Sequence, residues 1–283
     1  MSIYISSQAD YKWLRAVLVT AVILLFAGCS SGPPRVDTHE SLNATLWAYT
    51  AAEYAASTTQ AYHIAGVNLD LALADPQWSA ALEQRSGYSS LPPAVLIDID
   101  QTVLDNSHYN SDIIARYGGY SQKTFKEWCN EIAATAVPGA KYFVDHARER
   151  GVTIIYYSRR LETLRDCTTR NMEALGFSLP NQEHLLLNNG LPATEKAQLR
   201  TELASQFRIL LLVGDDLDDF IAGSKTEAAA RTALANQHAD RWGREWIILP
   251  NPMHGGWEAS LYGFDYPLPR DEQLHLKQRH LAE

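Results

Sequence analysis

The sequence predicts an α/β fold in which a doubly wound, mostly parallel β-sheet is covered by helices on both faces. Apolar runs short enough for buried strands recur at residues 94–97, 152–156, 184–187, 209–213 and 246–249, the run at 184–187 being the weakest. Helical patterns lie between them, at residues 140–150, 161–175 and 194–206. Strands that alternate with helices imply right-handed crossovers, and these produce a parallel sheet buried on both sides.

The predicted core, residues 91–270, is preceded by a region that we expect to be helical. Apolar residues recur at helical spacing through the first part of residues 39–90, and Asp75-Pro76 interrupts the pattern. One long helix or a helical pair fits this pattern. Its apolar stripe needs a partner, so we expect it to pack on the core.

Two further segments complete the predicted organisation. Residues 107–137 are too long for a simple strand-to-helix turn and carry several aromatic side chains, which indicates a small cap insertion over the carboxyl end of the first strand. Residues 271–283 form a C-terminal tail. The apolar share of 46% allows a sizeable core.

The N-terminus has the pattern of an export signal. Lys12 and Arg15 precede an apolar run over residues 16–27. These twelve residues would rise only about 18 Å as a helix, which is too short for a bilayer core of about 30 Å. We therefore predict a cleaved signal peptide over residues 1–28.

The four residues Phe26-Ala27-Gly28-Cys29 resemble a bacterial lipobox. This resemblance implies that Cys29 becomes the mature N-terminus and is acylated, with palmitate among its chains, and that residues 29–38 form a lipidated tether. Ser30 after the cysteine resembles the sorting signal for the outer membrane, on its periplasmic or its surface side. An ordinary cleaved signal with a chance cysteine is the alternative.

Charge and cysteine content restrict the possible partners. The formal net charge is −9, and no basic stripe is visible of the kind that nucleic acid binding requires. Beyond Cys29 the chain has only Cys129 and Cys167. An exported compartment permits a disulfide between them, and two unpaired thiols fit the sequence equally well.

Polar side chains follow three of the predicted strands. Asp98 and Asp100 come after the first strand, Ser158 after the second, and Asp215 after the run at 209–213. The carboxyl ends of parallel strands meet at one edge of the sheet, where ligands bind. Neighbouring carboxylates need a cation to offset their charges, and ligand sets made only of oxygen suit Mg²⁺. The sequence therefore predicts a magnesium site at this edge, with Asp219 nearby.

Two segments carry a family resemblance. Residues 98–106, Asp-Ile-Asp-Gln-Thr-Val-Leu-Asp-Asn, resemble the first signature of class C acid phosphatases in the haloacid dehalogenase (HAD) superfamily. Residues 214–220, Gly-Asp-Asp-Leu-Asp-Asp-Phe, resemble the second. The likeness runs from about residue 47 to 258 and is to the lipoprotein e branch, often called 5'-nucleotidases. Gln101 stands where glutamate is usual, and Asp216 where asparagine or threonine is usual.

The resemblance implies a HAD-like, Rossmann-type fold and a magnesium-dependent acid phosphatase. Asp98 would form an aspartyl-phosphate, and Asp100 would protonate the leaving alcohol and later accept a proton from water. The first role of Asp100 requires a protonated carboxyl, which suits an acidic pH optimum or a raised pKa. Lys196 would steady the nucleophile. The resemblance places the cation on Asp98, the Asp100 carbonyl and Asp215, with Asp219 behind it or coordinating as well.

The resemblance also implies substrate contacts. Hydroxyls at Thr102 and Ser158 would bind phosphate oxygens. Aromatic side chains would stack on a nucleotide base, which makes nucleoside 5'-monophosphates expected substrates among phosphate monoesters. These side chains come from the insertion and from a later loop, where a histidine replaces the usual tyrosine: Tyr120, Phe125, Trp128 and His254.

Two alternative functions fit the same sequence. A phosphotransferase or a narrow sugar-phosphate phosphatase would use the same scaffold. A catalytically silent lipoprotein that binds partners through its helical N-terminal region is the alternative of another class, and the complete set of catalytic residues argues against it. The sequence leaves the oligomeric state open.

Overall fold

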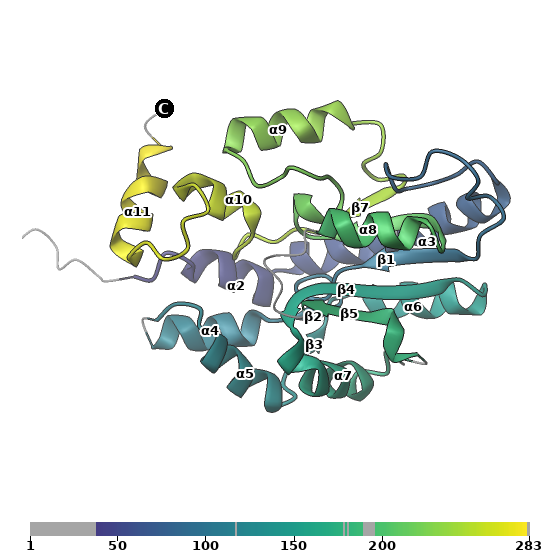
Figure 1. Cartoon of the computed structure of the whole chain (residues 1–283). Helices are drawn as coiled ribbons and strands as arrows, with labels where there is room; N and C mark the ends of the chain where they lie inside the picture. Colours follow the sequence, from purple (N-terminus) through teal and green to yellow (C-terminus); the bar gives the residue numbers. More distant parts are fainter. Residues whose placement is uncertain (1–37, 117, 178, 180, 189–195, 282–283) are drawn as a thin grey trace, which may run out of the picture. The chain divides into compact units, whose positions relative to one another are not determined.

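The computed structural model describes residues 38–116, 118–177, 179, 181–188 and 196–281 (Figure 1). The chain divides into two compact units, Met1–His39 and Glu40–Glu283, and the architecture below is that of the second. The predicted signal peptide, with Cys29, lies outside the described residues. Among those residues, no helix has both the length and the apolar character required to cross a bilayer.

The centre of the second unit is a five-stranded sheet in the order β5-β4-β1-β6-β7, and every neighbouring pair is parallel. This arrangement confirms the predicted α/β fold. β1 lies between β4 and β6. The chain adds β4 and β5 on one side of β1 and then β6 and β7 on the other, and such a switch point opens a crevice at the carboxyl ends of the strands. The strands are β1 Pro93–Ile97, β4 Thr153–Leu161, β5 Leu185–Asn188, β6 Arg208–Gly214 and β7 Trp246–Ile248.

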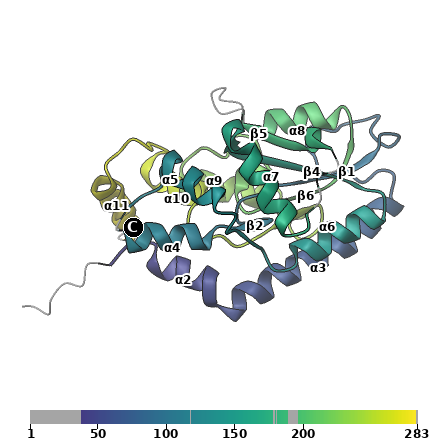
Figure 2. The same cartoon turned by 90° about the horizontal axis from the view of Figure 1, so that it is seen from below.

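Helices cover both faces of the sheet. α3, α6 and α7 lie on one face, and α8 and α9 lie on the other (Figures 1 and 2). The α-helices are α2 Leu42–Thr50, α3 Ala52–Ala74, α4 Ser107–Ala115, α5 Gln122–Asn130, α6 Ala140–Glu149, α7 Arg165–Ala174, α8 Lys196–Ala204, α9 Ala228–Gln237, α10 Gly256–Ala259 and α11 Arg270–Arg279. The short elements are β2 Leu104–Asp105, β3 Thr135–Ala136 and the 3₁₀ turns η1 Glu162–Leu164, η2 Gln182–His184, η3 Leu217–Asp219 and η4 Ser260–Tyr262.

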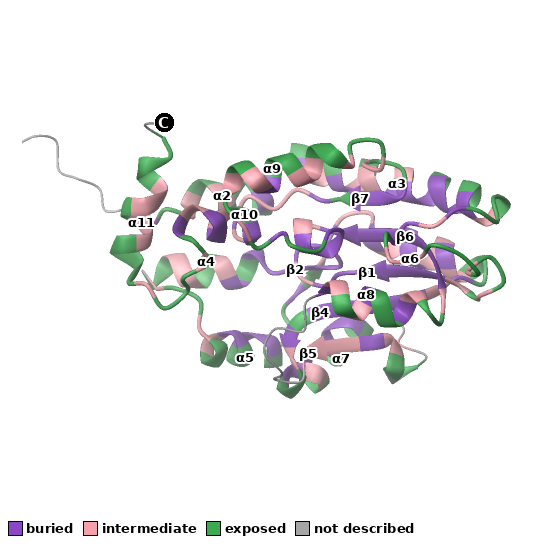
Figure 3. Ribbon diagram, turned by 45° about the horizontal axis from the view of Figure 1, so that its top comes forward, coloured by how far each residue is buried: buried purple, intermediate pink, exposed green. Residues whose placement is uncertain are grey.

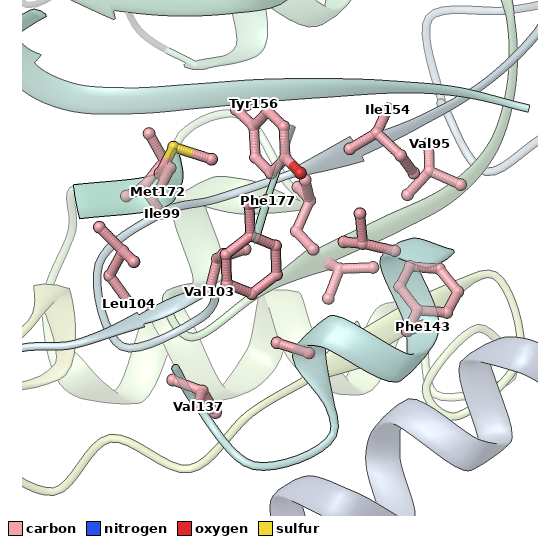
Figure 4. Packing of buried hydrophobic residues seen from close by; sticks show 14 of the residues in the cluster. Val95, Ile99, Val103, Leu104, Val137, Phe143, Ile154, Tyr156, Met172 and Phe177 are labelled. Atoms are coloured by element: carbon pink, nitrogen blue, oxygen red, sulfur yellow. The ribbon is translucent and has the colours of Figure 1, made fainter. Parts of the chain in front are cut away.

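The strands are apolar on both faces because both faces are covered. In β1, Val95 and Ile97 join the cluster with α3, α6 and α7, whereas Ala94 and Leu96 join the cluster on the side of α8. Figure 3 shows β6 buried throughout and β1 and β4 buried over most of their length, and Figure 4 shows the first cluster from close by. The continuous apolar runs in the sequence are therefore the pattern of a doubly covered sheet.

The helical region that precedes the core consists of α2 and α3. The two helices are separated at Ala51, whose backbone is extended. α3 packs against α6, β6 and β7. Its Tyr62 hydroxyl donates a hydrogen bond to the backbone oxygen of Thr102, 2.5 Å away, and so fixes the loop that follows β1.

The cap insertion contains α4 and α5, and the antiparallel pair β2–β3 borders it. Figure 1 shows α4 and α5 beyond the carboxyl ends of the strands, at the same end of the sheet as α10. A disulfide joins Cys129 in α5 to Cys167 in α7, with 5.6 Å between their Cα atoms. The structure thus selects the disulfide from the two possibilities that the sequence allows, and it ties the insertion to the core.

One strand differs from its prediction. β4 extends to Leu161, beyond the predicted end at residue 156, because Leu161 still pairs with Asn188 of β5. Ser158 therefore lies within β4 and does not follow it. The predicted helix over 161–175 was wrong in its first turn, since α7 begins only at Arg165 after the turn η1.

Candidate active site

Asp98 lies directly after β1, at the carboxyl end of the sheet. Its backbone N–H donates to the Val213 oxygen at 3.0 Å, and the residue is only 4% exposed. Carboxylate oxygens of Asp98, Asp215 and Asp219 all lie within 4.8 Å of one another. These three side chains come from two strand ends and can hold a divalent cation.

Asp215 is oriented from two sides. One oxygen accepts a hydrogen bond from the Thr102 hydroxyl at 3.2 Å, and the other accepts one from the Asn251 amide at 2.7 Å. Thr102 is fully buried, and this hydrogen bond directs its hydroxyl toward the carboxylate cluster. Asn251 had no role in the sequence prediction, although it begins the loop that contains His254.

Asp219 closes the turn after β6 and holds Lys196. One of its oxygens accepts the backbone N–H groups of Asp215 and Asp216 at 3.1 and 3.0 Å. The other pairs with the Lys196 ammonium, which also pairs with Asp98. Gly214 is required for this turn, because a Cβ there would lie 2.1 Å from an Asp219 oxygen.

The Lys196 ammonium offsets only part of the negative charge of the carboxylate cluster. Burial raises the pKa of Asp98 to about 7, although the Lys196 charge opposes the rise. Burial and the neighbouring Asp219 charge raise the pKa of Asp215 to about 7, and burial also raises that of Asp219 to about 7. Three carboxylates face one ammonium, so a divalent cation would neutralise the site.

Asp100 has partners of its own. The Arg160 guanidinium forms an ion pair with it, the Asn106 amide donates to it, and the Ser158 hydroxyl donates to it at 3.2 Å. Burial raises the pKa of Asp100, but the charge and hydrogen bonds of Arg160 outweigh this effect, and the pKa lies below its usual value. The sequence had allowed for a raised pKa at this position, and the structure gives the opposite direction.

Asp216 binds a loop and is not one of the three clustered carboxylates. One oxygen accepts the Gly256 N–H, the other accepts the Asp218 N–H at 3.0 Å, and Arg231 lies 3.6 Å from it. Gly256 permits this approach, because a Cβ there would lie 2.8 Å from Asp216. The carboxylate that departs from the family pattern thus anchors the loop that contains His254.

The predicted stacking residues differ in exposure. Phe125 and Trp128 are 6% and 4% exposed and pack against Tyr109. Tyr120 is 59% exposed, with its ring 5.7 Å from that of Phe125. Burial and the Asp100 charge raise the pKa of Tyr120 to about 12.

His254 is the remaining predicted substrate contact. Burial lowers its pKa, and the Asp100 charge opposes that shift. Its backbone N–H donates to the Asn251 side-chain oxygen at 3.4 Å. The Asp100 charge thus acts on both His254 and Tyr120, while Phe125 packs against Tyr120 and Trp128 packs against Phe125.

Comparison with known proteins identifies the family of this chain. The family model of the HAD superfamily, subfamily IIIB (acid phosphatase), matches residues 24–257. The chain belongs to this acid phosphatase family. Two solved structures of the class C acid phosphatase from Bacillus anthracis, one of them with tungstate bound, are each 30% identical to this phosphatase. Each match covers 84% of this chain and 95% of the other, with a TM-score of 0.76.

The family membership confirms the predicted recognition and makes the chain a phosphomonoesterase. In this phosphatase the structure brings together Asp98, Asp215, Asp219 and Lys196, whereas the Asp100 carboxyl pairs with Arg160. Sequence reasoning gave no role to Arg160, Asn106 or Asn251. A signal existed for Asn106, which ends the first signature, and for Arg160, which stands two positions after Ser158.

Proposed function

We propose that the chain is a magnesium-dependent acid phosphatase that hydrolyses phosphate monoesters through an aspartyl-phosphate at Asp98. The observation that carries the proposal is the buried Asp98 carboxylate at the end of β1, paired with Lys196 and within 4.8 Å of two further carboxylates. A nucleophile in this position needs its own charge and that of the phosphate to be offset.

The residues around Asp98 supply part of that charge. Lys196 is fixed between Asp98 and Asp219, and these carboxylates outweigh the effect of burial and raise its pKa, so it stays charged beside the nucleophile. Mg²⁺ would be held by Asp98, Asp215 and the Asp100 carbonyl, and when bound it would offset the repulsion between Asp98 and the phosphate. Asp219 would orient Lys196 and the turn from behind.

Proton transfer is assigned to Asp100. For alcohol leaving groups the carboxyl must first be protonated, and its lowered pKa confines this form to more acidic solution than an ordinary aspartate would need. Water that hydrolyses the aspartyl-phosphate must then lose a proton to the ionised carboxylate, which Arg160 favours. The first requirement predicts a rate that rises toward acidic pH when the leaving group is an alcohol.

Nucleoside 5'-monophosphates are proposed among the substrates. The exposed Tyr120 ring offers a stacking face, and the Asp100 charge acts on both Tyr120 and His254. The hydroxyls of Thr102 and Ser158 are proposed to shift between their present carboxylate partners and phosphate oxygens. Stacking tolerates every base, so the proposal includes a broad range of monophosphates.

The central experiment uses the chain lacking residues 1–29. It should hydrolyse p-nitrophenyl phosphate at mildly acidic pH, lose activity in EDTA and regain it with Mg²⁺. Asp98→Asn should abolish turnover without a loss of fold, whereas Asp166→Asn, at an exposed side chain, should not. Wild-type rates in Asp98→Asn would rule out covalent catalysis at this residue.

Substrate range needs a separate measurement. Phosphate release from nucleoside monophosphates, sugar phosphates and pyridoxal phosphate should show a preference for nucleotides that Tyr120→Ala reduces. An unchanged preference in Tyr120→Ala would remove the stacking proposal. Transfer of phosphate to an added acceptor alcohol would instead indicate a phosphotransferase.

We also propose that Cys29 is acylated and anchors the enzyme to the bacterial outer membrane. The lipobox-like residues before Cys29 support this proposal, and the Cys129–Cys167 disulfide suits an oxidising compartment outside the cytosol. Mass spectrometry of the mature N-terminus tests it, since an unmodified residue there is incompatible with the anchor.

A further inference from the structure

Arg160 is the buried cation beside Asp100. It lies near the end of β4 and is 4% exposed. Its Nε lies 3.1 Å from both carboxylate oxygens of Asp100, and its Nη2 lies 2.8 Å from Oδ1. A guanidinium that meets a carboxylate along its forked edge fixes the orientation of that carboxylate as well as its charge.

Arg160 is itself held by groups from the insertion and from α7. Its Nη1 donates to the Thr168 hydroxyl at 3.0 Å, and its Nη2 lies 3.5 Å from the Asn106 side-chain oxygen. The guanidinium carbon lies 5.2 Å from the centre of the Phe125 ring, and Nη1 lies 3.8 Å from the Cys129 sulfur of the disulfide. The arginine is therefore fixed before any substrate arrives.

This arrangement argues against a direct contact between Arg160 and the substrate phosphate. The Nε, Nη1 and Nη2 groups all have protein partners, so a phosphate oxygen would have to displace one of them. Asp98 and Asp219 pair instead with Lys196. Lys196 and Arg160, both buried, thus serve different carboxylates.

We propose that Arg160 is a positioning residue that aims the Asp100 carboxyl at the leaving-group oxygen. This inference rests on the proposed function, in which Asp100 transfers the proton. Arg160 also contacts Phe125, which supports Tyr120, so it links the acid to the aromatic side chains proposed to bind the leaving group. Arg160 acts on the reaction through Asp100 and does not touch the substrate.

The need for a well-aimed acid depends on the leaving group. An alkyl phosphate releases an alkoxide unless a proton is supplied, whereas 2,4-dinitrophenyl phosphate releases a stable anion. General acid catalysis typically contributes about 10²- to 10⁴-fold. Loss of the Arg160 fork should therefore slow the release of alcohols and leave the release of dinitrophenolate nearly unchanged.

The test compares kcat/KM for a nucleoside 5'-monophosphate and for 2,4-dinitrophenyl phosphate. This ratio of constants reports the steps up to formation of the aspartyl-phosphate and excludes its hydrolysis. In Arg160→Gln we expect roughly a 100-fold loss with the nucleotide and less than about 5-fold with the dinitrophenyl ester. An equal loss with both substrates would overturn the proposal.

Two variants accompany this measurement. Arg159→Gln is the matched control, because Arg159 pairs with Asp218 and has no contact with Asp100, and it should keep the ratio between the two substrates. If Arg160→Gln fails to fold, Arg160→Lys retains the buried charge but loses the fork. It should show the same selective loss to a smaller extent, and a uniform loss in the lysine variant would equally overturn the positioning role.

A benchmark separates this inference from the proposed function. Asp100→Asn should itself show the selective loss with the nucleotide. If Asp100→Asn is selective and Arg160→Gln is not, the positioning role fails and the assignment of Asp100 stands. If Asp100→Asn loses both activities equally, the acid assignment fails, and the positioning role that depends on it fails as well.

Discussion

Replacing both cysteines of the Cys129–Cys167 disulfide by alanine should lower the free energy of unfolding by about 4 kcal/mol. The two residues are 38 positions apart, and closing a loop of that length removes about this much chain entropy from the unfolded state. For a unit of this size a loss of 1 kcal/mol lowers Tm by roughly 2–4 °C. The variant should therefore melt about 10 °C below the oxidised protein.

Chemical denaturation of the chain lacking residues 1–29 is the suitable assay. The oxidised wild type, the wild type in dithiothreitol and the double alanine variant should be measured together. The reduced wild type should approach the variant, and the variant should not respond to dithiothreitol. Both sulfur atoms are buried, at 0% and 3% residue exposure, so a further small loss from the two missing atoms is expected in the variant.

Two results would refute this reasoning. Titration of two free thiols in the unfolded, unreduced protein would show that the disulfide does not form. Equal denaturation midpoints for oxidised and reduced wild type would show that the link between α5 and α7 adds no stability. The first result would contradict the presence of the disulfide, and the second would contradict its expected entropic stabilisation.

Three further predictions follow from the carboxylate cluster. Gly214→Ala should abolish activity because the added Cβ would displace the Asp219 carboxylate. The control Gly66→Ala, whose Cβ would make only ordinary contacts on α3, should keep activity and raise the free energy of unfolding by about 1 kcal/mol in urea denaturation. Asn251→Ala should weaken Mg²⁺ binding about 10- to 100-fold in calorimetry, since Asp215 loses its amide partner. Calorimetry should also show Mg²⁺ affinity rising with pH up to about 7, where Asp98 and Asp215 lose their protons. In the metal-free protein the same raised pKa values stabilise the folded state at low pH. That contribution to the free energy of unfolding is lost as the pH rises through about 7.

The sheet and the acidic cluster could be predicted because each has a short-range signal. A strand buried on both faces is apolar without interruption, and β1 and β6 both have this pattern. Carboxylates that follow such strands must meet at the same edge of a parallel sheet. The positions of Asp98 and Asp215 therefore follow from strand order alone.

The end of β4 could not be predicted for the opposite reason. Ser158 and Arg160 are polar and look like the start of a loop, yet both side chains are buried because they bind Asp100. The strand continues because Leu161 pairs with Asn188 of β5, a contact over a long stretch of chain. The disulfide has the same character, since nothing in the local sequence of Cys129 indicates that α7 lies beside α5.

The two aspartates of the first signature show how partners, and not residue type, decide chemistry. Asp98 and Asp100 are two positions apart, yet the pKa of the first is raised and that of the second is lowered. Asp98 and Asp219 share the single Lys196 ammonium in a cluster of carboxylates, whereas the Arg160 guanidinium forms its ion pair with Asp100. A divalent cation would reverse the shift at Asp98 and make it a nucleophile at neutral pH. It would leave Asp100 dependent on acid, because the charge that holds Asp100 belongs to the protein.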